Sequence, residues 1–474
     1  MAINKQLLTL SDEIFLNIEK RQQPMHVAGL QLFKYPQDAG PQYMADQVAE
    51  LQLLTRPKGQ FAKRITKHFS KAFWIEDNEF DLEHHFRRHA LPTPGRIREL
   101  LAFVSAEHSN LMDKQRPLWE FHLIEGLPDN QFAIYSKLHH AMTDGMSAMR
   151  MMINALSPDP DLRHMPPLWA NATKTPATNI SDGLLLSQYE NLKSVMATAG
   201  KQVGSLPKVY SETLALLRNT DSEFGFGGAP KSILNQKITG SRRYAAQSYS
   251  LDHLKLLGKK LNCTLNDIVL ATCSGALRHY LISQNALPSQ PLKAAVPVSL
   301  RADESVGGNQ VGLMIVNLAT HIPDPLQRFD VITRSISKAK QHFSSLSAEE
   351  AQNLTALMLF PTLLNFLTGM APNKQAFNVI ISNVPGPREP LYWNGAQMTG
   401  LYPVSIVLDQ MALNITITSY NGSLEFGLTA CRRSIPSMQR MLEFIDTAIM
   451  ELETISGISE HAIVKTLGSE SLCF

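Results

Sequence analysis

The stretch Phe132-Ala-Ile-Tyr-Ser-Lys-Leu-His139-His140-Ala-Met-Thr-Asp144-Gly145 decides how this chain is interpreted. Residues 132–138 alternate in the way that a half-buried β-strand does. Because successive side chains of a strand point to opposite faces, His140 shares a face with Phe132 and Leu138, and His139 falls on the other face. We therefore expect only one of the two histidines to enter a given cavity.

A helix is predicted directly after the histidine pair. Apolar residues recur at helical spacing from Met146 through Met149 and Ile153 to Leu156, and Asp144 stands where an N-cap residue belongs. The motif is therefore a strand-to-helix junction, a common place to expose a catalytic side chain.

A packed, hydrogen-bonded structural role is the alternative for any histidine, but a pair followed four residues later by Asp-Gly favours catalysis. The chain also contains His84-His85, which has His89 rather than an acidic residue at that spacing, and we interpret this pair as mainly structural. Metal binding by Asp81, His84, His85 and His89 is the alternative, but no matching Cys or Glu spacing supports a closed site. No metal is predicted.

Composition indicates a globular protein large enough for an extensive core. The 474 residues are 44% hydrophobic and 18% charged, with a net charge of +2. The sequence contains no dense basic stripe with interleaved aromatic residues, so nucleic acid is not predicted as a partner. The pair Arg242-Arg243 is interpreted as part of a solvated face, with phosphate contact as the alternative.

Cysteine usage and the N-terminus indicate a cytoplasmic protein. The four cysteines, Cys263, Cys273, Cys431 and Cys473, form no CxxC pair, which is typical of reduced thiols. Asp12 and Glu13 come before any long apolar stretch, so we expect no secretory signal peptide.

One segment, residues 351–373, has no charged residue, but Pro361, Asn365 and Gly369 interrupt it. A spanning helix needs about 20 predominantly apolar residues, so no transmembrane helix is predicted. This segment has two interpretations, which are compatible with each other. The first is a pair of buried core helices, and the second is the wall of an alkyl-chain tunnel or a patch that touches a lipid surface.

Alternating strands and helices predict a mixed α/β fold, with two domains. Residues 119–125 and 132–140 read as a hairpin around Leu127-Pro-Asp-Asn130, and Asn421-Gly422 suits a type I′ turn between two strands. The proline-rich stretch from Ser157 to Pro176 reads as the start of a linker, and residues 183–218 look helical.

The HHxxxDG pattern resembles that of the chloramphenicol-acetyltransferase-like superfamily, which includes the condensation domains of peptide synthetases. Further motifs narrow the resemblance to the bacterial wax ester synthase/acyl-CoA:diacylglycerol acyltransferase family. These are, in order, Pro117-Leu-Trp119, Asn266-Asp267, Val296-Pro-Val-Ser-Leu-Arg301 and Ser382-Asn-Val-Pro-Gly-Pro387. The resemblance spans essentially the whole chain, with no departure at the motif positions.

This resemblance implies two chloramphenicol-acetyltransferase-like α/β domains with an active-site tunnel between them. The expected division is an N-terminal half at 1–165 with HHxxxDG, a linker with a helical crossing at 166–234, and a C-terminal half at 235–474. The implied activity is transfer of a long-chain acyl group from acyl-CoA to a fatty alcohol or diacylglycerol, with no bound cofactor and peripheral contact with membrane or lipid inclusions. A condensation-domain-like enzyme that uses carrier-bound acyl groups is the alternative, and a non-catalytic lipid-surface protein is a third.

Ester formation from a thioester needs a base, a donor for the tetrahedral oxyanion and a dry channel. Histidine has an unperturbed pKa of about 6.5, and a positioned base contributes roughly 10²- to 10⁴-fold in rate, so His140 is the candidate base. Without a Gly-x-Ser-x-Gly elbow or an obvious nucleophile, direct attack by the alcohol is favoured over an acyl-enzyme.

The resemblance also implies a structural Asp144 that pairs with an arginine of the other half, for which Arg301 is the best match, and a helix cap is its simpler role. Asn266 is a candidate oxyanion donor, with an N-cap amide as the alternative. Trp119 is expected to pack beneath the site, with direct substrate contact as the alternative. The residues expected to bind substrate are Pro117, Leu118, Trp119, Gly145, Ser382, Asn383, Val384, Pro385 and Gly386.

Overall fold

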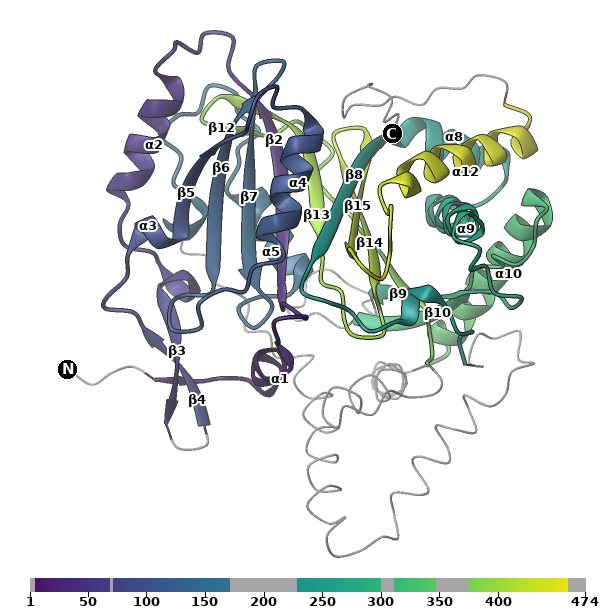
Figure 1. Ribbon diagram of the computed structural model, residues 1–474. Coiled ribbons are helices and arrows are strands. Elements are labelled where there is room, and N and C mark those ends of the chain that lie inside the picture. The colour runs from purple at the N-terminus through teal and green to yellow at the C-terminus, as the bar shows by residue number, and fades with distance from the viewer. Residues whose placement is uncertain (1–4, 69–70, 171–227, 300–310, 347–374, 459–474) are drawn as a thin grey trace, which may run out of the picture.

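The computed structural model describes residues 5–68, 71–170, 228–299, 311–346 and 375–458. Two six-stranded mixed sheets lie side by side, each with helices packed on it, and a small three-stranded sheet lies beside the first of them (Figure 1). The helices are α1 (Leu10–Ile18), α2 (Tyr43–Leu53), α3 (Leu82–His85), α4 (Ile97–Glu107), α5 (Gly145–Asn154), α8 (Leu251–Lys260), α9 (Leu265–Ser283), α10 (Pro325–Ser344) and α12 (Arg440–Ser456).

The first large sheet has the order β12-β13-β2-β7-β6-β5, and all its neighbours are antiparallel except β5 and β6. Its strands are β2 (His26–Lys34), β5 (Phe86–Ala90), β6 (Trp119–Leu127), β7 (Gln131–His139), β12 (Tyr392–Trp393) and β13 (Ala396–Val404). The small sheet, in the order β1-β4-β3, is formed by β1 (Gln6–Leu7), β4 (Lys71–Glu76) and β3 (Lys63–His68).

The second large sheet has the order β10-β9-β11-β14-β15-β8, in which β11 is parallel to both β9 and β14. Its strands are β8 (Arg242–Ser250), β9 (Lys293–Ser299), β10 (Val311–Asn317), β11 (Val379–Val384), β14 (Leu413–Tyr420) and β15 (Ser423–Cys431). Helices α8, α9, α10 and α12 gather on the side of this sheet that faces away from the first half (Figure 1). The α/β fold with mixed sheets is thus confirmed.

The two predicted hairpins are present. Strands β6 and β7 are antiparallel, and Asp129 and Asn130 in their connection have φ of 58° and 57°. Strands β14 and β15 turn at Asn421 and Gly422, with φ of 41° and 82°, and positive φ at both central residues is the mark of a type I′ turn.

The prediction that the strand before the histidine pair is half-buried is wrong, because β7 is buried on both faces. The alternation itself is present: Phe132, Ile134 and Leu138 belong to one core cluster with residues of α2 and α5. Ala133 and Tyr135 belong to another, with residues of α4 and β8. Strand β7 therefore lies in the interior of the molecule rather than at its surface.

The first sheet is completed from the last quarter of the chain. Strand β13, within the range expected for the C-terminal half, pairs with β2 along Gln397–Val404, and β12 pairs with β13. At the other end of the expected N-terminal half, Leu168, Trp169 and Ala170 are buried in the same core as β7. The division at 165 and 235 remains a prediction, but residues outside 1–165 complete the first half.

The junction between the sheets is tight and polar in part. A Cβ on Gly427 of β15 would lie 2.0 Å from the Pro403 carbonyl oxygen of β13, so only glycine allows this approach. Beside it, the Ser248 hydroxyl of β8 lies 2.8 Å from the Tyr402 hydroxyl of β13 and donates a hydrogen bond to the Glu425 carboxyl of β15. All three side chains are buried, so this network joins the two halves in the interior.

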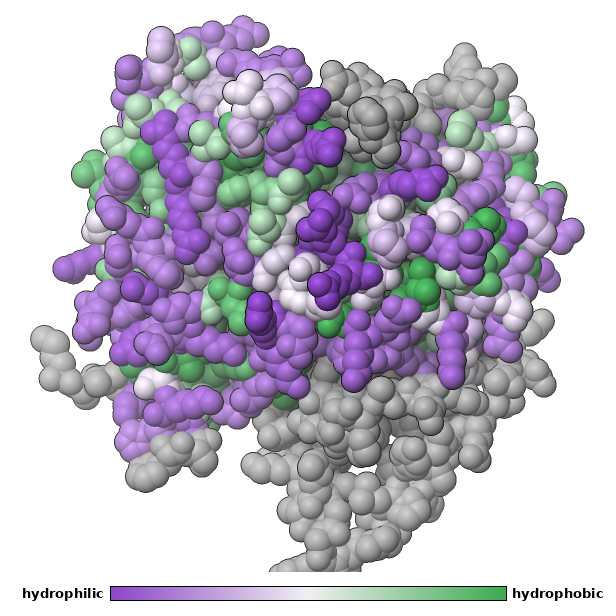
Figure 2. Space-filling model, viewed as in Figure 1, coloured by the Kyte–Doolittle hydropathy of each residue, from purple (hydrophilic) through white to green (hydrophobic). Residues whose placement is uncertain are grey.

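Hydrophilic residues cover most of the face drawn in Figure 2, with small groups of apolar residues between them. Among the helices that the structure describes, none combines the length and apolar character that crossing a membrane requires. The uncharged segment 351–373, the predicted helical stretch 183–218 and Cys473 lie outside the described residues. Cys263, Cys273 and Cys431 are free thiols.

Candidate active site

The histidine pair lies where the central strand of the first sheet ends. His139 is the last residue of β7 and pairs with His26, the first residue of β2. Two backbone hydrogen bonds fix the pair: His139 N–H donates to the Leu118 carbonyl at 3.0 Å, and His140 N–H donates to the Met25 carbonyl at 2.8 Å. The histidine pair is therefore held from both sides by the strands that flank β7.

His139 is sealed in the interior, with no exposed surface. Its Nδ1 accepts a hydrogen bond from Ala141 N–H at 3.0 Å, so in the neutral ring the proton is on Nε2. That Nε2 lies 3.3 Å from the Glu19 carboxylate, whose exposed fraction is 1%. Nδ1 is thus hydrogen-bonded and Nε2 faces a buried carboxylate, so His139 is not placed to exchange protons with a substrate.

His140 is partly exposed, and its ring stacks on Phe15 with centroids 4.0 Å apart and an interplanar angle of 26°. Among the described residues, no hydrogen bond engages either of its ring nitrogens. Burial lowers the pKa of His140 to about 4, Asp144 opposes this shift, and the neighbouring His139 adds to it. A neutral imidazole at pH 7 has a lone pair ready to accept a proton.

Asp144 is the N-cap of α5, as predicted. One carboxylate oxygen accepts from Ser147 N–H at 2.7 Å and the other from the Ser147 hydroxyl at 3.0 Å. Among the described residues, no hydrogen bond joins Asp144 to His140; the carboxylate is bonded to Ser147 instead. Its predicted partner Arg301 lies outside the described residues. Gly145, the first residue of α5, is exposed.

The Pro117-Leu118-Trp119 segment leads into β6, beside the end of β7, and Pro117, Leu118 and Trp119 are all buried. Trp119 stacks on Trp169 at 5.4 Å and on His85 at 4.6 Å, and its indole N–H donates to the Phe61 carbonyl at 2.9 Å. Trp119 is therefore packed in the core, as expected, and its direct contact with substrate stays a prediction. The carbonyl of Leu118 holds His139, so this segment supports the pair through its backbone.

The Ser382-Asn383-Val384-Pro385-Gly386 segment begins on β11 rather than after it. Strand β11 includes Ser382, Asn383 and Val384, which pair with β14. The turn therefore starts at Pro385, later than the predicted start at Ser382. At Gly386 a Cβ would lie 2.1 Å from the Ser419 carbonyl oxygen, so the expected close backbone approach is present. The parallel pairing with a central strand extends β11 because it satisfies the backbone groups of residues 382–384.

Asn266 is the second residue of α9, not its N-cap. Thr264 caps this helix, in a reciprocal capping box with Asp267, so the N-cap alternative for Asn266 is wrong. Within the described part of the chain, its amide makes no hydrogen bond and no contact links it to the histidine pair. Helix α9 packs on α8, α10 and α12. The oxyanion role of Asn266 stays a prediction.

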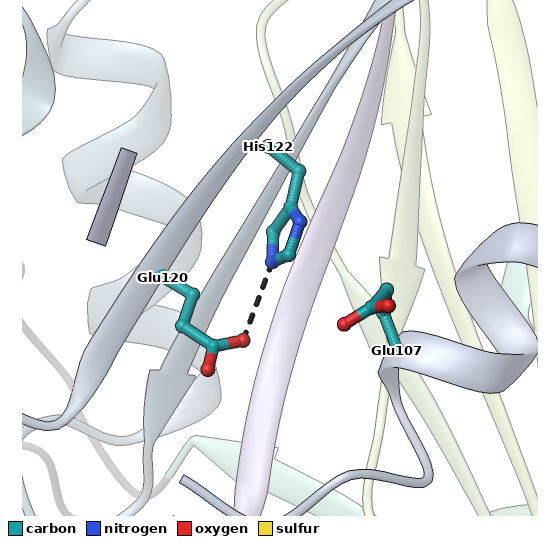
Figure 3. A group of neighbouring side chains, drawn as sticks. All are labelled: Glu107, Glu120 and His122. Carbon is teal, nitrogen blue, oxygen red and sulfur yellow. Dashed lines mark hydrogen bonds and ion pairs between the residues drawn. The ribbon is translucent and has the colours of Figure 1, made fainter. Parts of the chain in front are cut away.

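The other histidine pair is structural in its contacts. His85 donates from Nδ1 to the Trp119 carbonyl at 2.8 Å and stacks between Phe80 and Trp119, and Asp81 caps α3. A different group lies close enough for metal binding: ligand atoms of Glu107, Glu120 and His122 lie within 4.8 Å of one another (Figure 3).

Lys137 already supplies a cation to that group. Its ammonium donates to Glu120 at 3.0 Å and to the backbone carbonyls of Glu107 at 3.0 Å and Asn110 at 2.9 Å. Figure 3 shows His122 directed at the Glu120 carboxylate, 3.3 Å away. We therefore assign this cluster to the support of β6 and β7 and propose no metal site there.

Sequence reasoning missed the residues of α1 that contact the pair. Phe15 covers the His140 ring, and Glu19, directly after α1, reaches His139. The available signal was their spacing, since residues four apart lie on one face of a helix. It also missed His26, which is fully buried and donates from Nε2 to the His108 carbonyl at 2.9 Å.

Two family models together match most of the chain. The model for the wax ester synthase/diacylglycerol acyltransferase catalytic domain matches residues 8–269, and that for the WS/DGAT C-terminal domain matches residues 307–453.

Named relatives match over nearly their whole length. The Acinetobacter baylyi protein named O-acyltransferase WSD is 46% identical over 461 residues, which is 96% of this chain and 98% of the relative. A Mycobacterium tuberculosis protein named probable diacylglycerol O-acyltransferase is 43% identical, over 95% of this chain and 100% of the relative.

Solved structures agree at two levels. The wax ester synthase/diacylglycerol acyltransferase from Marinobacter aquaeolei VT8 is 46% identical and superposes with a TM-score of 0.79, over 95% of this chain and 100% of that chain. The starter condensation domain of rhizomide synthetase has a TM-score of 0.55 over 98% of this chain and 97% of that domain, but 14% identity, so it shares the fold alone.

Proposed function

Because this chain belongs to the wax ester synthase/diacylglycerol acyltransferase family and is an O-acyltransferase, we propose that it transfers a long-chain fatty acyl group from acyl-CoA to a fatty alcohol or a diacylglycerol. The products are then a wax ester or a triacylglycerol, together with free CoA. No bound cofactor is required, since acyl-CoA is a co-substrate.

We propose His140 as the general base, and one observation carries this assignment: the ring of His140 is partly exposed with its nitrogens unengaged, whereas His139 beside it is sealed. The neutral ring removes the proton from the acceptor hydroxyl as that oxygen attacks the thioester carbonyl. The new C–O bond forms, the C–S bond of the tetrahedral intermediate breaks, and the proton passes from His140 to the departing CoA sulfur.

The lowered pKa of His140 has two consequences for this role. A base with a pKa of about 4 is almost wholly neutral at pH 7, so little of the enzyme is lost to protonation. It is also a weak base. Bound substrate changes its pKa in two ways: exclusion of further water lowers it, and a stronger interaction with the charge of Asp144 raises it. Stacking on Phe15 fixes the plane in which the proton is accepted.

The remaining roles are proposed relative to the position of the histidine pair. We retain Asn266 as the candidate oxyanion donor and place the acyl chain in a tunnel between the halves, lined in part by Ser382–Gly386. Leu118 and Trp119 act by supporting the pair: both are buried, and the Leu118 carbonyl accepts a hydrogen bond from His139 N–H. We propose that the enzyme works in the cytoplasm against a membrane or lipid inclusion.

Purified protein with palmitoyl-CoA and either hexadecanol or diacylglycerol, followed by free thiol release, tests the reaction. We expect CoA release to depend on the acceptor and both acceptors to be used. Stoichiometric CoA release without an alcohol, leaving acylated protein, would overturn direct transfer. Turnover only with a carrier-bound acyl donor and an amine would favour the condensation-domain-like alternative.

A further inference from the structure

Glu19 lies at the point where helix α1 meets the buried face of the histidine pair. It directly follows α1, its backbone N–H donates to the Phe15 carbonyl at 3.2 Å, and its side chain is 1% exposed. Phe15, on the turn before it, carries the stacked ring of His140. One short helix thus contacts both histidines, His140 through an aromatic ring and His139 through a carboxylate.

The Glu19 carboxylate is held in place by three groups. One oxygen accepts from Met25 N–H at 3.1 Å and lies 3.3 Å from His139 Nε2, and the other lies 2.9 Å from the Lys114 ammonium. Burial alone would raise the pKa of Glu19, but His139 and Lys114 hold it at about 2. The group is therefore a carboxylate, and so an acceptor only, at any pH at which the enzyme works.

An acceptor at this position decides which nitrogen of His139 carries the proton. His139 Nε2 lies 3.3 Å from the Glu19 carboxylate, while Nδ1 keeps its lone pair and accepts from Ala141 N–H at 3.0 Å. That bond closes the bend between β7 and α5, and His140 is the residue at the bend. If the proton moved to Nδ1, two N–H groups would face each other and the bend would open.

We infer that Glu19 is a positioning residue for the acyl transfer: it fixes His139 as the Nε2–H tautomer, and His139 in turn holds the backbone that aims His140. The inference rests on the proposed role of His140 as the base. Glu19 itself touches no reacting atom, and it acts through His139 and Ala141 only.

Two substitutions separate the acceptor from its bulk. Glu19→Gln keeps an oxygen that can accept from both Met25 N–H and His139 Nε2, and the partly exposed Lys114 can turn away from the new amide. Glu19→Met has similar size but no comparable acceptor. We expect Glu19→Met to lower kcat about tenfold with KM for palmitoyl-CoA within about twofold, by analogy with carboxylates that orient metal-binding histidines, whose loss typically costs 10- to 100-fold. Glu19→Gln should stay within about threefold of the parent.

Glu120→Gln is the matched control. Glu120 is also buried, burial opposes its ionisation, and His122, Lys137 and Arg87 hold its pKa at about 2, but it does not contact the histidine pair. This change should lower the melting temperature while leaving kcat of the folded protein within about twofold. Equal kcat for Glu19→Gln and Glu19→Met, or a tenfold effect of Glu19→Met in a His139→Ala background, would overturn the inference.

The tautomer provides a readout that does not depend on turnover or on the recovery of a variant. Nitrogen-15 NMR of histidine-labelled wild-type protein reports it, with the His139 ring assigned as the resonance absent from His139→Ala. We expect Nε2–H, and a mixture of tautomers in Glu19→Met. An Nδ1–H tautomer in the wild-type protein would refute the role of Glu19 even if the enzyme is active. Loss of the proposed function would instead appear as no wild-type turnover with hexadecanol.

Discussion

Replacing Glu425 by Gln should remove a pH dependence of stability that is built into the junction between the halves. The carboxyl is buried and accepts hydrogen bonds from Ser248 and Tyr402, and burial, opposed by these bonds, raises its pKa from 4.5 to about 8. In the folded protein it is therefore protonated at neutral pH, whereas in the unfolded chain it is ionised.

The sign follows from proton binding. Between pH 4.5 and about 8 the folded state holds a proton that the unfolded state has released, so stability is fully present below pH 4.5 and is lost as pH rises toward 8. At about 1.4 kcal/mol per pH unit, this group removes about 4 kcal/mol between pH 5 and pH 8. A glutamine does not titrate, so its free energy of unfolding carries no such loss.

Urea unfolding of both proteins at pH 5 and pH 8 measures the difference. Comparing the two proteins cancels the titration of the buried histidines, and comparing the two pH values cancels the fixed cost of placing an amide beside Ser248 and Tyr402. Glu425→Gln should therefore gain about 4 kcal/mol relative to wild type on going from pH 5 to pH 8. An equal effect at both pH values would show that the carboxyl is ionised in the folded protein, and the reasoning would be wrong.

Three further predictions concern the active site. His140→Ala should reduce kcat at least a hundredfold with little change in melting temperature. His139→Ala should reduce kcat less but lower the melting temperature more, because His139 is the buried member of the pair. Equal losses of kcat in the two folded variants would contradict the roles proposed for the two histidines. Because burial lowers the pKa of His140 to about 4, kcat/KM should stay flat from pH 8 to about pH 5, and a fall centred near pH 6.5 would contradict a desolvated base. Asp144→Ala should lower the free energy of unfolding by about 1 kcal/mol if Asp144 only caps α5, and by about 3–5 kcal/mol if Asp144 also pairs with Arg301. If the two residues pair, adding Arg301→Met should recover stability. Additive effects in the double mutant would show that Asp144 and Arg301 do not touch.

Local patterns predicted the frame of the site because their causes are local. Alternation around residues 132–138, the cap at Asp144 and the Asn421-Gly422 turn each depend on a few neighbouring residues, and all three are present. The cap of α9 was also within reach, because Thr264 followed three residues later by Asp267 is a capping-box pattern. Asn266 attracted the prediction only because Asn is itself a favoured cap residue.

Long-range partners explain what sequence reasoning could not supply. Lys137 carries a charge in a strand predicted to be half-buried, yet it is buried, because Glu120 and two backbone carbonyls satisfy its ammonium. The interpretation of Arg242 as part of a solvated face is wrong, because Arg242 is buried. Its guanidinium donates to the carbonyl of Gln22, a residue far away in the sequence, at 2.8 Å. Burial of a charge depends on partners that no local pattern contains.

Residues that are distant in sequence also hold strand β7, which ends at the histidine pair. His26, paired with His139, donates to the His108 carbonyl, and His108 donates from Nε2 to the Ser405 carbonyl at 3.0 Å. Because a carbonyl only accepts, Nδ1 of His108 is left to accept from the Tyr135 hydroxyl on β7 at 2.8 Å. Ser405 directly follows β13, the strand that the last quarter of the chain adds to the first sheet. The bend at His140 is therefore supported from α1 on one side and from the β13 side of the sheet on the other, so its geometry is set only when segments from both ends of the chain have packed around β7.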